Sequence, residues 1–361
     1  MILAFYIFSG ICIFASLLPL LPFQHWMFRV WEFGRIQLMI IQLLTLGIGA
    51  LCIAEKDTLF IITTLVLLSV IIHNLIILIP YTSLYGKKQV NNIPKETQSV
   101  SIISVNVYQF NERYEELLQL VKEVKPDILL TMESNQAWED ALEAIEDDYP
   151  NYKKIALENT YGMHFYTKLP VKSVKIHHFI SDDLPSIEAR ICLENDEQFT
   201  FFGIHPPPPS PTEEDTSKER DGELLALGKR ILDTEGPVIV VGDFNNVAWA
   251  KSSILFRKTS KLIDPRIGRG FVSTYHAKYK LLRFPIDLCF HSPHIVIQDF
   301  NTLRYVGSDH LPLFCSFFIS KKDNVLKEDL DTLNEEEEEE VEEMIEKGEE
   351  EKGDRPEVAT E

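Results

Sequence analysis

The segment PVIVVGDFNN, residues 237–246, decides the fold. A run of β-branched residues after a Pro predicts a fully buried strand, and Gly242 permits a sharp turn where that strand ends. Asp243 and Asn245 follow two positions apart, so an extended backbone presents a carboxylate and a carboxamide on the same side. The segment therefore predicts a place for chemistry at the end of a buried strand. Taken alone, it is also compatible with a strand that ends in an ordinary turn.

Polar side chains lie beside five other apolar runs, and they decide between these two interpretations. The residues are Asn106, Glu133, His205, Asp287, Asp309 and His310. Carboxylate and carboxamide oxygens are hard ligands that suit Mg²⁺ or Mn²⁺ far better than zinc. Histidine moves protons near neutral pH, and a divalent ion with open positions binds phosphoryl oxygens. These residue types predict metal-dependent chemistry at a phosphoryl group.

In their order and spacing, the six motifs resemble the endonuclease/exonuclease/phosphatase superfamily. Its members include pancreatic-type deoxyribonucleases, abasic-site endonucleases, neutral sphingomyelinases and inositol polyphosphate phosphatases. The resemblance covers about residues 100–319. It implies an α/β fold, a deoxyribonuclease-like two-sheet sandwich flanked by helices, and the hydrolysis of phosphoric esters. We expect this domain at residues 99–322.

The resemblance also implies a metal site. Glu133 matches the principal ligand of Mg²⁺ or Mn²⁺, with Asn106 and Asp309 close to the metal. One position departs from the pattern of many abasic endonucleases, because Tyr108 stands where they have a second acidic residue. This departure weakens the case for their metal arrangement and for DNA repair.

Catalytic roles follow from the resemblance for five further positions. His310, paired with Asp287, matches the histidine that orients or activates the attacking water. Asp243 and Asn245 match the pair that positions the nucleophile and holds the scissile phosphate. His205 matches the histidine that stabilises the phosphate or assists the leaving oxygen. The Pro-rich loop after His205, residues 206–211, is expected to form a rigid rim of the site, with a plain spacer as the alternative.

Three apolar segments precede the domain, at about residues 2–23, 36–54 and 59–79. Each is about long enough to cross a hydrocarbon layer of ~30 Å as a helix, and none has the polar face of a soluble core helix. We therefore expect a multi-pass membrane protein, in a cell or inner membrane, with a polar linker at 82–98. His73 and Asn74, within the third segment, predict a helix–helix contact, with a functional role as the lesser alternative.

Two indications disagree about the side of the membrane on which the domain lies. With three spans, five basic residues lie on the side of the domain and one lies opposite, counted as Arg29, Arg35, Lys87, Lys88 and Lys95 against Lys56. The positive-inside rule then places the domain in the cytoplasm. Membrane-attached members implicated in glycopeptide resistance resemble this layout and work outside the cytoplasm, so the resemblance favours the opposite side.

The last segment, residues 323–361, has nineteen acidic and four basic residues and holds most of the net charge of −20. Such a composition buries little apolar surface, and we expect a disordered acidic tail. A solubilising role is the simplest interpretation, with calcium buffering by the Glu run as an alternative.

The domain itself is acidic, with twenty-three Lys and Arg against thirty-two Asp and Glu over residues 100–320. A protein that grips DNA by its phosphates usually needs a basic face, so this balance disfavours non-specific DNA binding. Residues 251–283 are the exception, because nine basic side chains there face one acidic residue, Asp264. That stretch is compatible with an anionic substrate, with anionic lipid headgroups, or with a solvated surface.

Three functions follow from these patterns. The first is a membrane-anchored phosphatase or phosphodiesterase with a lipid-linked or small phosphorylated substrate, such as a polyprenyl pyrophosphate. The second is a metal-dependent endo- or exonuclease, the only case in which nucleic acid is a partner. The third is a non-catalytic membrane scaffold with a degenerate site, which the intact motif set disfavours.

Overall fold

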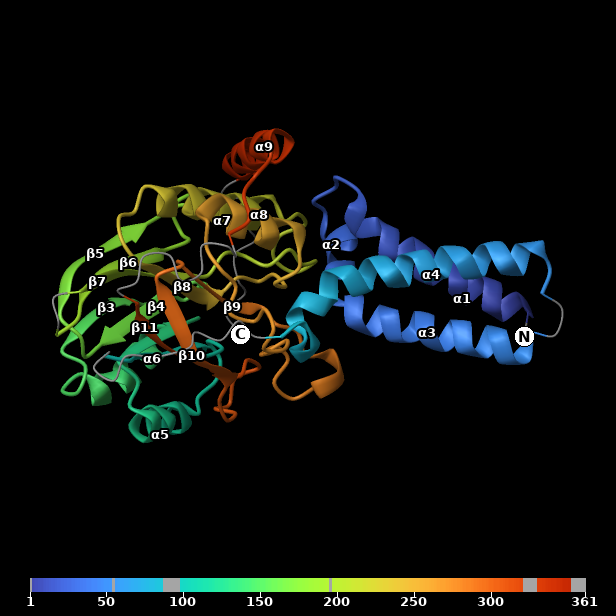
Figure 1. The fold of residues 1–361 in the computed structure, drawn as a ribbon. Helices are drawn as coiled ribbons and strands as arrows, with labels where there is room; N and C mark the ends of the chain where they lie inside the picture. Colours follow the sequence, from blue (N-terminus) through green and yellow to red (C-terminus); the bar gives the residue numbers. More distant parts are fainter. Residues whose placement is uncertain (1, 54–55, 87–97, 195–196, 321–329, 352–361) are drawn as a thin grey trace.

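The structure, a computed structural model, describes residues 2–53, 56–86, 98–194, 197–320 and 330–351. It has two parts, a bundle of N-terminal helices and a sandwich of two mixed β-sheets with helices on the outer faces (Figure 1). This is the α/β architecture that the sequence predicts. Most of the predicted linker, residues 87–97, lies outside the described residues.

The sandwich consists of a six-stranded and a five-stranded sheet. The first has the order β10-β11-β1-β2-β4-β3, with β1 Val100–Asn106, β2 Ile128–Met132, β3 Asn151–Ile155, β4 Met163–Thr167, β10 Ile295–Thr302 and β11 Leu313–Ile319. The second has the order β5-β6-β7-β8-β9, with β5 Val171–His177, β6 Ser186–Cys192, β7 Gln198–Ile204, β8 Val238–Asp243 and β9 Asp287–His291.

The register of three strand pairs brings the predicted site residues to one edge. β1 and β2 are parallel and Asn106 lies opposite Met132, so Glu133 follows at the same level. β7 and β8 are also parallel, so His205 and Asp243 leave neighbouring strands together. β8 and β9 are antiparallel, and Asp243 lies directly opposite Asp287. Pairing therefore places polar groups from both sheets at the same end of the sandwich.

Two glycines allow close packing, Gly203 between the sheets and Gly242 within the second sheet. The inter-sheet core consists of apolar side chains from both inner faces. A Cβ on Gly203 would lie 2.8 Å from Leu130 Cδ1, so a larger residue would separate the sheets there. Gly242 has φ +157°, and a Cβ there would lie 1.9 Å from Ile204 O. Gly242 therefore lies within β8 rather than at the turn expected there, and the chain turns at Asn245 instead.

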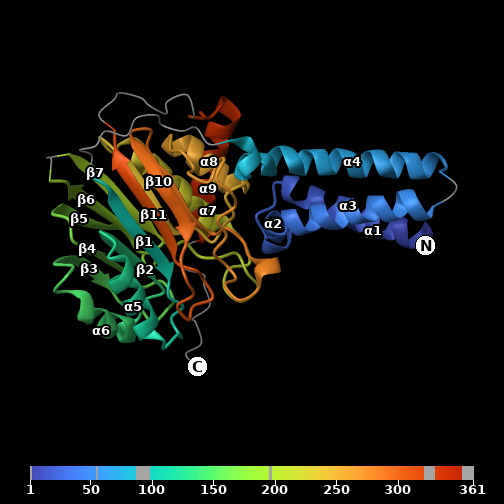
Figure 2. The ribbon, with the colours of Figure 1, turned by 60° about the horizontal axis from the view of Figure 1, so that its bottom comes forward.

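Helices cover both outer faces of the sandwich (Figure 2). α5 (Tyr114–Val124) and α6 (Gln136–Leu142) pack on the first sheet. α7 (Lys218–Leu232) and α8 (Lys251–Ser260) pack on the second sheet. The outer apolar faces are buried in this way, which leaves the strand ends as the accessible edge.

The N-terminal bundle contains α1 (Ile2–Leu17), α2 (Trp26–Phe33), α3 (Arg35–Cys52) and α4 (Thr58–Leu78). Three stretches are long and apolar enough to cross a membrane, namely Ile2–Leu20, Arg35–Cys52 and Thr58–Tyr81. Arg35 Nη1 donates to Asn74 Oδ1 at 2.8 Å, and Asn74 Nδ2 donates to Gln42 Oε1 at 3.4 Å. The helix–helix contact predicted at Asn74 is therefore confirmed.

The bundle docks on the loops that follow β8 and precede β9. Trp249 Nε1 donates to Glu32 O at 2.8 Å, and Tyr81 OH donates to Ala248 O at 3.0 Å. Gly268 N donates to Pro80 O at 2.8 Å. The short 3-10 turns η2 (Ile79–Tyr81) and η3 (Ser83–Tyr85) continue α4 at this joint. Both views show the apolar helices extending from one end of the sandwich (Figures 1 and 2).

The prediction of a disordered tail is wrong for residues 335–351, which form helix α9 (Glu335–Glu351) against α7. Val341, Met344 and Gly348 are buried and form one face of this helix. A Cβ on Gly348 would lie 3.1 Å from Gly222 Cα, so the two helices touch at their glycines. The prediction rested on the acidic composition of the whole tail, which gives no indication of this short apolar face. Residues 323–329 and 352–361 lie outside the described residues.

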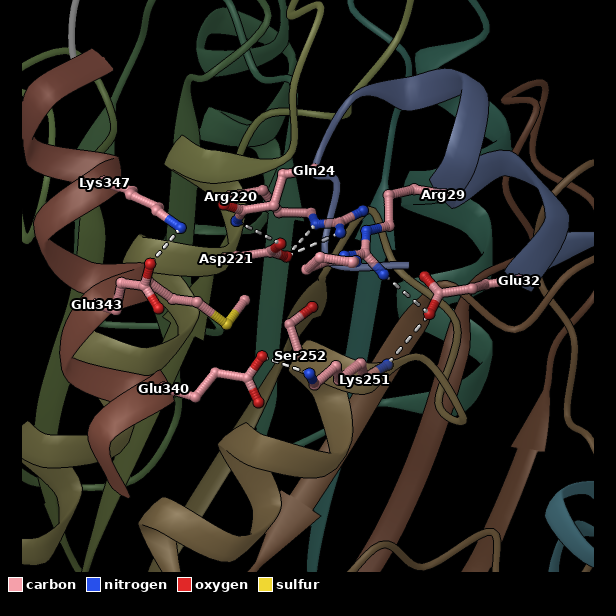
Figure 3. Close-up of a pocket in the computed structure, with 12 residues that line it drawn as sticks. Gln24, Arg29, Glu32, Arg220, Asp221, Lys251, Ser252, Glu340, Glu343 and Lys347 are labelled. Carbon is pink, nitrogen blue, oxygen red and sulfur yellow. Dashed lines mark hydrogen bonds and ion pairs between the residues drawn. The ribbon is translucent and has the colours of Figure 1, made fainter. Parts of the chain in front are cut away.

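Charge complementarity holds α9 in place. Its glutamates pair with lysines of α7 and α8, in the pairs Lys229–Glu342, Lys251–Glu340 and Lys258–Glu337. Where α2, α7, α8 and α9 meet, a cavity of about 90 Å³ is lined by four basic and four acidic side chains that largely pair with one another (Figure 3). The cavity lies at the joint between the bundle, the sandwich and the tail helix, and its lining charges balance one another. It is distinct from the carboxylate cluster at the strand ends.

His164 on β4 is a buried histidine in the layer under α6. Neither ring nitrogen has a hydrogen-bond partner in the described part of the chain. Burial, and secondarily the charge of Lys154, lowers the pKa of His164 to about 3. Glu139 Oε2 lies 3.7 Å from Nε2, but burial outweighs its attraction.

This histidine makes the fold sensitive to acid. From pH 6.5 down to about 3 the unfolded chain binds a proton at His164 that the folded chain does not, so stability falls as the pH falls. The expected loss between pH 7.5 and pH 5 is about 2 kcal/mol. His164→Leu should remove that part of the pH dependence in denaturant unfolding of the detergent-solubilised protein. Equal losses in the parent and the variant would contradict the assignment.

Candidate active site

The eight site residues predicted from sequence converge at the strand ends. They come from both sheets and from the loop before β11, and most are buried. The set is Asn106, Glu133, His205, Asp243, Asn245, Asp287, Asp309 and His310. Their roles remain predictions, but their proximity is a geometric fact.

Asn106 joins the two sheets. Its Nδ2 donates to Glu133 Oε1 at 2.8 Å and to Asp243 Oδ2 at 3.1 Å. Glu133 also accepts from Gln109 N at 3.1 Å through Oε2. Its backbone has φ +58°, an uncommon conformation for a residue other than glycine that is enriched at functional sites. The loop after β2 therefore turns the Glu133 carboxylate towards the other sheet.

Asp287 and His310 form a second short polar contact of the site. His310 Nδ1 lies 2.8 Å from Asp287 Oδ2, and His310 Nε2 lies 3.6 Å from Asp243 Oδ2. Burial alone would lower the pKa of His310, but the Asp287 and Asp243 carboxylates outweigh it and raise this pKa to about 10. The Asp287 carboxylate therefore fixes the ring and directs Nε2 towards Asp243.

His205 has the opposite electrostatic situation. Its Nε2 lies 3.9 Å from Asp243 Oδ2, and its ring centroid lies 5.4 Å from that of Tyr161. Burial outweighs the attraction of Asp243 and lowers the pKa of His205 to about 4. Two histidines on either side of one carboxylate thus prefer different protonation states, which is typical of acid–base sites.

Asn245 follows Asp243 in a tight turn with φ +47°. Its backbone N donates to Asp243 Oδ1 at 2.9 Å, and its Nδ2 donates to Pro206 O at 3.0 Å. Arg220 is buried and donates from Nη1 to Asn245 O at 3.0 Å. The Pro-rich loop is therefore bonded to a predicted site residue, which favours the predicted rigid rim over a plain spacer.

The residues fit a divalent cation. Burial, opposed by the Asn106 hydrogen bond, raises the pKa of Glu133 to about 7, and Asp309 adds to this through its charge. A buried carboxylate beside further hard oxygens is stabilised by a bound cation. The ligand atoms of Asp243, Asp287 and His310 also lie within 4.8 Å of one another. In that group the His310 ring is hydrogen-bonded to Asp287. The ligand set expected from the sequence, Glu133, Asn106 and Asp309, stays a prediction.

Several residues of the site carry no signal in the sequence pattern. The Tyr275 ring lies tilted against His310 with ring centroids 4.9 Å apart, and Thr274 Oγ1 accepts from Asp287 N at 3.4 Å. Tyr108 and Phe110 form an exposed aromatic pair beside Asn106, with centroids 5.6 Å apart. They come from loops whose position depends on tertiary contacts.

The family model described as the Endonuclease/Exonuclease/phosphatase family matches residues 103–310. The chain belongs to this family. Its members hydrolyse phosphoric esters, including those of nucleic acids, and divalent-metal dependence is typical of them. No curated protein matches the chain in sequence.

Solved structures share the sandwich. D. rerio TDP2 complexed with a single-strand DNA product superposes with a TM-score of 0.52 at 17% identity, covering 61% of this chain and 99% of that one. A family protein from Bacteroides thetaiotaomicron gives 0.52 at 18% identity, covering 63% and 98%. The human Nocturnin catalytic domain with bound sulfate gives 0.50 at 17% identity, covering 61% and 94%. At these identities the likeness concerns the fold.

The metal assignment predicts a specific change in thermal stability. Glu133→Gln removes a partly buried negative charge whose pKa is raised, so the EDTA-treated variant should melt higher than the EDTA-treated parent at pH 8. Millimolar Mg²⁺ should raise the melting temperature of the parent by several degrees and that of the variant by much less. The exposed Glu115→Gln on α5 is the matched control. An undiminished Mg²⁺ response in Glu133→Gln would contradict the assignment.

Proposed function

We propose that the protein is a membrane-anchored, Mg²⁺-dependent hydrolase of phosphoric esters that acts on a lipid-linked or small phosphorylated substrate. Mg²⁺ is favoured because Glu133, Asn106 and Asp309 offer oxygen ligands, and Mn²⁺ is the alternative. The observation that carries the proposal is the joint between the apolar bundle and the loops that hold the site.

The proposed roles use the contacts around Asp243. His310 is held by Asp287 through Nδ1, so Nε2 is the atom that orients the attacking water. Asp243 Oδ2 lies within reach of that water and accepts its proton. His205, near the same oxygen and buried, stabilises the phosphate or assists the leaving oxygen. Bound Mg²⁺ supplies neutralisation of the charge that develops on the phosphoryl oxygens.

The geometry of the bundle supports a substrate in or near the bilayer. The loop 245–250 begins at the site and is held against α2 and η2 by Trp249 and Ala248. The loop 264–284 contacts the bundle at Gly268 and leads into Asp287. A membrane that surrounds the apolar helices therefore lies beside the loops of the site, which favours a lipid-linked phosphoester over a substrate from bulk solvent.

The nuclease alternative has weaker support. The fold of D. rerio TDP2, which was solved with DNA, keeps it open. The basic stretch 251–283 is, however, largely neutralised within the chain. Lys258 Nζ lies 2.6 Å from Glu337 Oε1, Arg257 lies 2.7 Å from Asp331, and the buried Arg266 lies 3.1 Å from Asp264. Fewer of these cations remain for a phosphate backbone, and a non-catalytic scaffold is disfavoured by the convergent site.

The activity prediction concerns the full-length protein in lipid nanodiscs. With Mg²⁺, one lipid substrate should be hydrolysed, with phosphate released from polyprenyl pyrophosphate or a phosphoinositide, or phosphocholine released from sphingomyelin. Single- and double-stranded DNA should remain intact. Glu133→Gln and His310→Ala should each lower turnover by about 10²-fold or more. His178→Ala, at an exposed position directly after β5, is the control and should retain activity. DNA cleavage with every lipid untouched would establish the nuclease instead.

For the side of the membrane we propose that the catalytic domain faces the cytoplasm, because five of six counted basic residues lie on its side. A C-terminal fusion to alkaline phosphatase, which is active only outside, should be inactive in cells. The same reporter fused after Lys56, between α3 and α4, should be active. The reverse pattern would place the domain outside, as the resemblance to resistance-associated members favours.

A further inference from the structure

An exposed apolar turn lies in the loop between α8 and β9. The 3-10 turn η5 (Lys280–Leu282) and the preceding Tyr279 leave three large side chains in solvent. The exposed fractions are 61% for Tyr279, 87% for Leu281 and 56% for Leu282. Contiguous exposed apolar side chains on a rigid loop are typical of an interaction surface.

The position of this turn relative to the bundle identifies what covers it. Gln37 Nε2 of α3 donates to Leu281 O at 2.8 Å. Gln37 is the third residue of the span that begins at Arg35, so it lies about 3 Å along the helix axis from that start. Phe33 and Phe284 also meet, with ring centroids 6.0 Å apart. Figure 1 shows the orange loop beside the end of α3 that faces the sandwich.

The chemistry of the turn matches the interface between acyl chains and headgroups. Lys278 and Lys280 are exposed and flank Tyr279. Alternating cations and apolar residues, with a Tyr among them, are favoured where hydrocarbon meets acidic headgroups. The Arg283 side chain is already hydrogen-bonded within the loop, because it donates to His276 O and Ala277 O. The two lysines are therefore the cations available to lipid phosphates.

The stem of the loop is bonded to the candidate site. Tyr275 pairs with His310 as an antiparallel bridge, and Ala277 N donates to Asp309 O at 2.6 Å. Leu311 N donates to Thr274 O at 3.1 Å. The tip at Leu281 and the residues Asp309 and His310 thus belong to one connected unit.

We propose that Tyr279–Leu282 is a lipid-binding turn that inserts its apolar side chains into the bilayer around α1, α3 and α4, with Lys278 and Lys280 on acidic headgroups. This inference rests on the membrane anchoring in the proposed function, and it does not depend on which substrate is hydrolysed. It places the candidate site at a fixed height above the bilayer surface.

The test uses the full-length chain in nanodiscs that contain acidic phospholipid. An environment-sensitive fluorophore is attached to Leu281→Cys after Cys52 and Cys192, the cysteines that are not buried, are changed to Ser. A nitroxide on the lipid acyl chains should quench this fluorophore at least twofold more than it quenches one at Leu232→Cys. Leu232, on the last turn of α7 and 49% exposed, is the matched leucine away from the bundle.

A third label distinguishes a failure of the lipid-binding turn from a failure of the membrane anchoring in the proposed function. Leu44→Cys lies within the span of α3 and is 61% exposed, so its fluorophore reports whether the bundle is in the bilayer. Quenching at Leu44 with iodide-accessible, unquenched fluorophore at Leu281 would overturn the lipid-binding turn and leave it to a soluble partner. No quenching at Leu44 would overturn the anchoring and the turn together. Lys278→Glu with Lys280→Glu should lower the quenching at Leu281 in acidic nanodiscs and leave it unchanged in zwitterionic ones.

Discussion

The placement of ionisable groups at the strand ends is the constraint on which the site depends. Asp243 and Asp287 lie opposite each other in an antiparallel pair, both buried, and their charges would repel each other if nothing lay between them. His310 lies between the two carboxylates, 2.8 Å from one and 3.6 Å from the other. From the other sheet, Asn106 Nδ2 donates a hydrogen bond to Asp243 Oδ2. The site is therefore held by electrostatic compensation within a rigid frame.

That frame is set by packing between sheets. Gly203 allows the first sheet to approach the second where a Cβ would collide with Leu130, and Gly242 does the same for the backbone of Ile204 within the second sheet. The parallel pairs β1–β2 and β7–β8 direct their carboxyl ends to the same edge, so residues that follow each strand meet there. An acidic cluster of this kind is costly without a cation, which explains why a fold with this site suits a divalent metal.

Different kinds of interaction connect the bundle and the tail helix α9 to the sandwich. Hydrogen bonds to backbone carbonyls join the bundle to the loops after β8 and before β9. α9 instead combines a narrow apolar face with pairs between its glutamates and lysines of α7 and α8. The first joint is buried and specific, whereas exposed ion pairs such as Lys229–Glu342 are weakened by salt. The two attachments should therefore respond differently to ionic strength.

The sequence by itself determined the strands, the apolar helices and the convergence of the motifs, because burial on both faces, span length and strand-end position are local patterns. β8 lies at Val238–Asp243, where the segment 237–246 predicts a buried strand, and the three apolar helices lie at the expected positions. Only the tertiary structure decided the rest. The docking of α9 was not predicted, because its three buried positions are outweighed by glutamates in any average over the tail. Tyr275 and Thr274 reach the site only because their loop folds back on Asp309 and Leu311. Local patterns specify what a segment prefers, whereas contacts between distant segments decide which preferences are satisfied.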